Sequence, residues 1–157
     1  MMRNLLLIAM AMVLASGCGN PAPKPSVEDE EGEEHHVHSP MFGGELMELG
    51  EHQANLEFTA DTTAGTVTVY VLDAHAEHPV RLADKSLQAE LMIGGEVIPI
   101  TLNAMENVLT GETVGDTAQF TGKHDALVGA QQFSLRISAI TVRGLPFKNI
   151  TWTHGKN

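Results

Sequence analysis

The chain has a single cysteine, Cys18, and it has only one tyrosine and one tryptophan. One thiol cannot form a disulfide within the chain, so stability in an oxidising compartment has to come from the core alone. The shortage of tyrosine and tryptophan argues against a carbohydrate-binding protein, because such proteins stack sugars on exposed aromatic rings.

Basic residues are scarce as well: nine Lys and Arg stand against 20 Asp and Glu, for a formal net charge of −11. No basic cluster is available to neutralise phosphates, which excludes nucleic acid as the expected partner. Catalytic signatures such as Gly-x-Ser-x-Gly, His-Glu-x-x-His and a glycine-rich phosphate loop are missing. We therefore expect that the protein is not an enzyme. We also expect the strand acids Glu57, Glu90 and Glu96 to lie on polar, solvent-facing sides.

The N-terminus has the layout of an export signal, with one cation, an apolar run and then small residues. Cys18 follows directly and makes this segment resemble the lipobox of bacterial lipoproteins, although that family usually has leucine where Ala15 stands. The resemblance implies a signal peptide over residues 1–17, cleavage before Cys18, and a lipid anchor there that includes palmitate. An ordinary signal peptide with an incidental cysteine stays open. A transmembrane anchor is disfavoured, because the run is shorter than the ~20 residues that span a bilayer.

Such an anchor places the protein in a bacterial cell envelope, on the periplasmic side or the cell surface. Three acyl chains make release negligible, since each buried methylene adds about 0.8 kcal/mol to membrane binding. In proteobacterial lipoproteins, aspartate after the cysteine tends to retain the protein on the inner membrane. This chain has Gly19 at that position, so the outer membrane is favoured over the inner.

Residues 18–40 have the composition of a disordered linker. Residues 20–26 are spaced by proline and favour an extended backbone, and residues 28–34 hold six acids in seven positions. Low hydrophobicity with dense like charge prevents a packed core. We expect an arm that lifts a domain off the membrane and packs on nothing.

The end of this arm is a candidate metal-binding tract, formed by Glu33, Glu34, His35, His36 and His38. Imidazole with carboxylate is a competent ligand set for Zn(II), Cu(II) or Ni(II), and short histidine-rich tracts are typical of metal binding. Ordering a flexible segment costs about 1–2 kcal/mol per residue, so binding should be weak, with no tightly bound cofactor. The alternative is a solvated spacer whose histidines have no role.

Beyond the arm the dominant period is two, which indicates β-strands. Seven segments alternate apolar with polar residues: 55–60, 66–71, 87–93, 98–102, 117–121, 133–139 and 147–153. Gly94-Gly95 supplies a two-residue hairpin turn between the third and fourth segments, and one or two helical turns are expected over 124–128. Residues 41–157 are therefore predicted to be all-β, a single antiparallel, immunoglobulin-like β-sandwich of about seven strands.

The remaining five histidines are weaker candidates for a site. His75 and His78 share one loop and would act as joint ligands only if that loop curls. His52, His124 and His154 are single residues, for which a surface position without a role is the simpler interpretation.

Three stretches of the domain together resemble a known group of proteins: residues 43–50, 65–73 and 78–80. They are similar to small uncharacterised secreted lipoproteins of planctomycete-like bacteria, and to N-terminal segments of periplasmic adaptor subunits of heavy-metal efflux pumps. In those segments a histidine commonly precedes the Gly-Gly pair, where this chain has Phe42. The resemblance covers residues 35–105 and implies a role in metal handling.

Together these observations predict a membrane-anchored, non-catalytic lipoprotein. It would bind Cu or Zn loosely through its tract and act as an accessory to metal handling or efflux. Its expected partners are the membrane, through the lipid, and an efflux-system or envelope protein. The alternative is a structural or interaction module in which the arm serves as a spacer only.

Overall fold

The computed structural model of the protein describes residues 38–155. The signal peptide predicted over residues 1–17 and most of the linker predicted over residues 18–40 lie outside this range. The same holds for five predicted site residues: Cys18, Glu33, Glu34, His35 and His36. Within the described range, no helix has the length and apolar character needed to cross a membrane.

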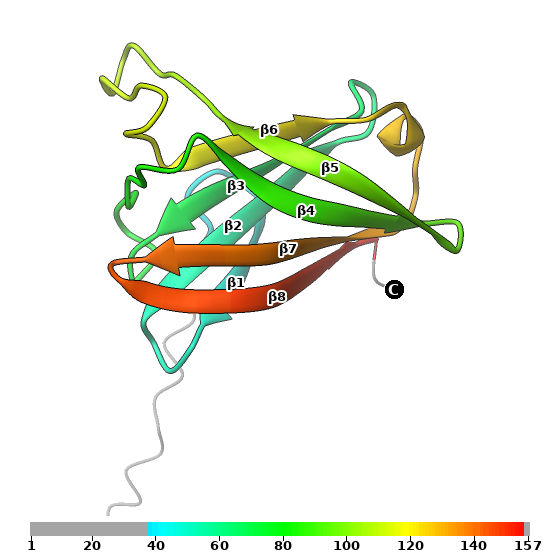
Figure 1. Cartoon of the computed structure of the whole chain (residues 1–157). Coiled ribbons are helices and arrows are strands. Elements are labelled where there is room, and N and C mark those ends of the chain that lie inside the picture. The colour runs from blue at the N-terminus through cyan, green and yellow to red at the C-terminus, as the bar shows by residue number, and fades with distance from the viewer. Residues whose placement is uncertain (1–37, 156–157) are drawn as a thin grey trace, which may run out of the picture. The chain divides into compact units, whose positions relative to one another are not determined.

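Strands make up almost all regular structure between residues 38 and 155 (Figure 1). In chain order they are β1 (Glu45–Leu49), β2 (Ala54–Asp61), β3 (Thr66–Leu72), β4 (Ser86–Ile93), β5 (Glu96–Ala104), β6 (Gln119–Lys123), β7 (Phe133–Val142) and β8 (Leu145–His154). A 3-10 helix, η1 (Asp125–Leu127), lies between β6 and β7. The prediction of an all-β antiparallel fold is confirmed, with eight strands in this range in place of about seven.

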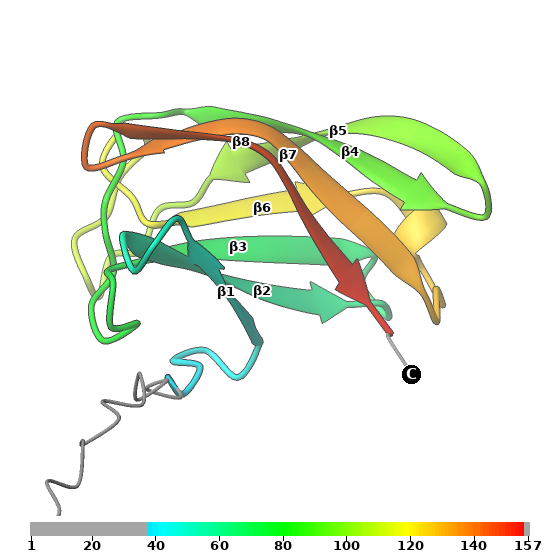
Figure 2. The same cartoon turned by 90° about the horizontal axis from the view of Figure 1, so that it is seen from below.

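These eight strands belong to one hydrogen-bonded antiparallel sheet, in the order β1-β2-β3-β6-β5-β4-β7-β8. The sheet folds over into a nearly closed, barrel-like sandwich (Figure 2), in which β4, β5, β7 and β8 face β1, β2 and β3. The two edge strands meet through Trp152 of β8, whose Nε1 donates a hydrogen bond to Oε2 of Glu45 in β1 at 3.0 Å. The two layers of the predicted sandwich are therefore parts of one continuous sheet.

The core follows from the alternation of apolar residues along the strands. In β3, Val67, Val69 and Val71 are fully buried, and the polar residues between them are partly exposed. Phe58 of β2 stacks on Trp152 of β8 across the two layers, with ring centroids 5.1 Å apart and planes inclined by 9°. Burying an apolar side chain of this size contributes about 1.5–3 kcal/mol, so this pair is a main link between the layers.

The two predicted hairpins are confirmed. β2 pairs with β3, and β4 pairs with β5. The turn of the second hairpin is Gly94-Gly95, whose φ angles are 60° and 87°. Glycine adopts these left-handed conformations without a steric penalty, which explains the residue choice at this turn.

Two details of the strand prediction need correction. The alternation does not predict β1, because Leu46-Met47 places two apolar residues side by side. Ala139, expected to face the core, is exposed, and the buried positions that follow in β7 are Ile140 and Val142. The inward face of β7 shifts by one residue at this point, where Asn149 of the neighbouring β8 has a φ of 53°.

Strand direction determines where the loops gather. Neighbouring strands alternate in direction across the whole sheet, so the connections after β1, β3, β5 and β7 fall at the same end of the sandwich (Figure 1). Segments far apart in the sequence therefore meet there, and this end carries the candidate site.

Candidate functional site

Residues 38–44, called the strap below, lie across the outer face of β2 and β3. Three backbone N–H groups of the strap donate hydrogen bonds of 2.7–2.8 Å to the side-chain carboxylate of Glu57 in β2, namely those of Met41, Phe42 and Gly44. These donors belong to the predicted domain, just after the arm predicted over residues 18–40. The expectation that the arm packs on nothing is wrong only for its described end, where the ring of His38 contacts His52 and His75.

The prediction that Glu57 faces solvent is wrong, because its side chain is fully buried. Alternation does place Glu57 on the outer side of β2, since its neighbour Phe58 lies in the core, but the strap covers that side. A buried carboxylate requires hydrogen-bond partners, and the three N–H groups supply them. The other two strand acids reach solvent as predicted: Glu90 is partly exposed and pairs with an arginine, and Glu96 is exposed.

Two further contacts hold the strap against the sheet. The ring of Phe42 stacks on Tyr70 of β3, with centroids 3.8 Å apart and planes inclined by 10°. Burial raises the pKa of Tyr70, and the neighbouring carboxylate of Glu57 raises it further. Gly44 approaches β2 so closely that a Cβ atom there would lie 2.2 Å from the carbonyl oxygen of Phe58. The strap is therefore held against the sheet at two points, by the stacked ring of Phe42 and by the close approach of Gly44 to β2.

The strap begins at His38, whose ring has two other imidazoles as neighbours. The centroid of His38 lies 5.7 Å from that of His52, in the β1–β2 turn, and 5.9 Å from that of His75, in the β3–β4 loop. The ring planes are inclined by 67° and 64°, respectively. These three residues are called the histidine cluster below.

The histidine cluster contains an unsatisfied polar atom. Nε2 of His38 is buried and has no hydrogen-bond partner among residues 38–155. Buried polar atoms without a partner are rare in native proteins, and each such atom costs about 1–3 kcal/mol. This atom therefore marks the cluster as a candidate binding site.

Glu48 orients the second imidazole. Nδ1 of His52 lies 3.0 Å from Oε2 of Glu48, and the backbone N–H of His52 donates to Oε1 of the same carboxylate at 2.8 Å. His52 also has a φ of 54°, a conformation uncommon outside glycine. Metal-ligating histidines usually donate one ring N–H to a carboxylate, a backbone carbonyl or water, which leaves the other nitrogen available to the metal. His52 has this arrangement.

The loop that carries His75 is braced from the sheet. Asn55, a buried residue of β2, donates from Nδ2 to the carbonyl oxygens of Asp73 and Ala74 at 3.1 and 2.9 Å. Ala76 is buried and has a φ of 56°. The backbone on both sides of His75 is therefore fixed, while the imidazole itself is exposed.

His78, the other histidine of this loop, pairs with Asp73 instead of joining the cluster, with Nδ1 and Oδ2 3.2 Å apart. Burial raises the pKa of Asp73, but hydrogen bonds from Glu77 and His78 outweigh this effect, so the pKa lies below its usual value. Of the two histidines in this loop, which the sequence offered as joint ligands only if the loop curls, one therefore belongs to the cluster and the other stabilises the loop.

The remaining two single histidines have structural contacts. Nδ1 of His124 accepts a hydrogen bond from the backbone N–H of Ala126 at 3.1 Å and so caps η1. The ring of His154 packs against Phe133 and Trp152, at centroid distances of 5.1 and 5.7 Å. Neither residue lies in the cluster.

As the side chains stand, the described residues contain no group of three or more His, Cys, Asp or Glu arranged to hold a metal ion. The cluster falls short because its rings meet edge to face, in two pairs that share His38. The rings of His52 and His75 are both exposed, although Glu48 holds Nδ1 of His52. A change of side-chain torsion costs about 0.5–1.5 kcal/mol.

Another buried acid, Glu112 in the β5–β6 loop, has a structural role. Its carboxylate accepts hydrogen bonds from the hydroxyl of Thr110 at 2.6 Å and from the backbone N–H of Ala118 at 2.8 Å. Burial raises its pKa, but these hydrogen bonds and the nearby charge of Arg81 prevail and lower it. Glu112 therefore fixes the base of a long loop.

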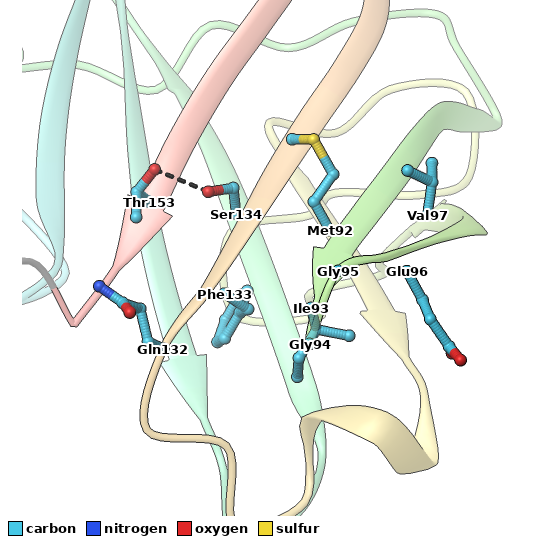
Figure 3. A pocket seen from close by; sticks show the side chains of 10 residues that line it. All are labelled: Met92, Ile93, Gly94, Gly95, Glu96, Val97, Gln132, Phe133, Ser134 and Thr153. Atoms are coloured by element: carbon cyan, nitrogen blue, oxygen red, sulfur yellow. Dashed lines mark hydrogen bonds between the residues drawn. The ribbon is translucent and has the colours of Figure 1, made fainter.

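A shallow groove of about 500 Å³ lies at the other end of the sandwich, between the β4–β5 turn and the start of β7 (Figure 3). The hydroxyl groups of Ser134 and Thr153 bond to each other on one side, 2.8 Å apart, and Met92 lies nearby. Among residues 38–155, Glu96 is the only acid or base that lines the groove. The groove therefore offers no pair of groups for acid–base chemistry.

Of the six predicted site residues, only His38 is among the described ones, and the structure brings it together with two histidines that the sequence presented as unrelated. No protein-family model matches the chain, and no curated protein and no solved structure matches it either.

Proposed function

We propose that the protein is a membrane-anchored bacterial lipoprotein that binds a transition metal loosely through its acidic, histidine-rich tract. It serves as a non-catalytic accessory to metal handling or efflux in the cell envelope. The lipid on Cys18 keeps the tract beside the membrane, and the domain holds the tract's far end.

One observation carries this proposal. His38, the last residue of the tract, lies on the domain surface beside two further imidazoles and has a buried ring nitrogen without a partner among the described residues. A spacer without a role gives no reason for histidines of the domain to gather where the tract ends. The resemblance of residues 35–105 to segments of metal-efflux adaptor subunits supports the same function.

The experiment is a calorimetric titration of the purified protein with Zn(II) near neutral pH. Replacing His35, His36 and His38 together with alanine should remove most of the binding heat. Binding should also weaken in acid, because protons compete with the metal for the imidazole nitrogens. His78→Ala, an exposed histidine outside the tract, is the control and should bind like the wild type. Equal, negligible heats from the wild type and the triple variant would refute the proposal.

The rival function is an interaction module. The observation in its favour is the β5–β6 loop, where two adjacent aliphatic side chains, Val108 and Leu109, are 92% and 93% exposed. Such a tip suits an apolar contact with another protein of the envelope. The titration separates the two functions, because an interaction module with a spacer arm has no reason to bind metal.

A further inference from the structure

We propose that His38, His52 and His75 form one folded three-histidine site for a divalent transition metal, Zn(II), Cu(II) or Ni(II). This inference rests on the proposed function, because it takes the same class of metal. It differs in assigning a single site of defined ligands, two of which belong to the domain and none of which requires His35 or His36.

The choice of metal follows from the ligand chemistry. The cluster offers three neutral imidazoles and no thiolate, and imidazole suits Zn(II), Cu(II) and Ni(II). Two carboxylates of these segments have other roles: Glu48 binds Nδ1 of His52, and Asp73 accepts from the backbone N–H groups of Glu77 and His78 and contacts the His78 ring. Three histidines with an open fourth position are also a known ligand set for zinc.

The two distances from His38 fit after small ring movements. Two imidazoles that share a metal at bond lengths of about 2.0–2.1 Å have ring centroids about 5 Å apart. The observed separations of 5.7 and 5.9 Å exceed this by less than 1 Å. The exposed rings of His52 and His75 can turn toward Nε2 of His38 without disturbing the core. A metal there would also satisfy the buried nitrogen.

Each ligand has its own support in the fold. His38 is held by the strap, through the three hydrogen bonds to Glu57. His52 is oriented by Glu48, and the loop of His75 is braced by Asn55. Because the ligands come from three segments that meet only in the folded domain, metal at this site should stabilise the fold, whereas metal on an unfolded tract should not.

The test titrates Zn(II) into the whole purified protein, in mild detergent, and follows both heat and thermal unfolding. The wild type should bind one equivalent tightly, with a rise in Tm, before weaker equivalents bind. His52→Gln and His75→Gln should each weaken the tight equivalent at least about tenfold, since removing even an outer partner of a metal ligand costs 10–100-fold. The double variant H35Q/H36Q should keep the tight equivalent and lose weak binding. His124→Gln is the control, because His124 caps η1 and lies outside the cluster.

A second measurement does not depend on domain variants. Cu(II) bound at one equivalent to H35Q/H36Q should give an electron paramagnetic resonance spectrum with couplings to three imidazole nitrogens. Tight binding that survives His52→Gln and His75→Gln, or that disappears in H35Q/H36Q, would overturn the site and leave the proposed function intact. A wild type that binds no Zn(II) at all would overturn both.

Discussion

Glu57→Gln should loosen the strap and destabilise the protein by about 2–4 kcal/mol. The substitution keeps the size and shape of the side chain and removes only its charge and one acceptor. Oε1 of Glu57 accepts from Phe42 and Gly44, and Oε2 accepts from Met41. The amide of glutamine can keep the first two bonds through its oxygen. Its NH₂ group then faces the N–H of Met41, and because both groups are donors the third bond is lost.

The magnitude follows from these three bonds. A buried N–H without an acceptor costs about 1–3 kcal/mol, and a bond to a charged acceptor is stronger than a neutral one by about 0.5–2 kcal/mol. One lost bond and two weakened bonds therefore exceed 2 kcal/mol. The strap can detach and let water reach its N–H groups, which limits the loss to about 4 kcal/mol. This is a large share of the roughly 5–15 kcal/mol that stabilises a typical domain.

Urea unfolding measures the loss, and amide hydrogen exchange locates it. The amides of Met41, Phe42 and Gly44 should exchange much faster in Glu57→Gln than in the wild type, while those of β3 stay protected. Glu96→Gln is the matched control, because Glu96 is also a strand glutamate but is exposed. A Glu57→Gln protein within 0.5 kcal/mol of the wild type, with unchanged exchange in the strap, would refute this account of the buried carboxylate.

Two further predictions concern acid and the membrane. Because the folded-state pKa of Glu112 is lowered, the stability it contributes is present above its unfolded pKa of about 4.3 and is lost as the pH falls through the folded value. Urea midpoints at pH 7 and pH 3 should therefore differ less for Glu112→Gln than for the wild type, and an equal difference would contradict this. Cys18→Ser should move the protein from the membrane fraction to a soluble or unprocessed form; a variant that stays in the membrane and is still cleaved at the same bond would show that no lipid is needed.

The sheet could be predicted from the sequence where one residue in two is apolar. Val67, Val69 and Val71 are buried as their spacing predicts, and Gly94-Gly95 forms the predicted hairpin turn. Periodicity predicts which side of a strand faces the core because the side chains of a strand alternate strictly between its two faces. It does not predict which other segment covers the outer side, and for that reason Glu57 was expected in solvent.

The histidine cluster could not be predicted for a different reason. His38, His52 and His75 stand in three separate segments, and no spacing in the sequence relates them. Their proximity depends on the order of strands in the sheet and on a strap that follows no strand pattern. A signal was present, however: a tract that ends in histidine, and two further histidines beside predicted strands. His52 stands just before residues 55–60, and His75 just after residues 66–71.

The contact between β1 and β8 has a consequence for crowding on a surface. An open sheet edge is a template on which a second chain can add a strand, and proteins concentrated in the plane of a membrane meet one another often. Here Trp152 bonds to Glu45 across the two edges and stacks on Phe58 beneath them. Polymerisation through these edges would first require this seam to open and the indole to leave the core. A densely packed layer of such domains should therefore resist fibre formation at this seam.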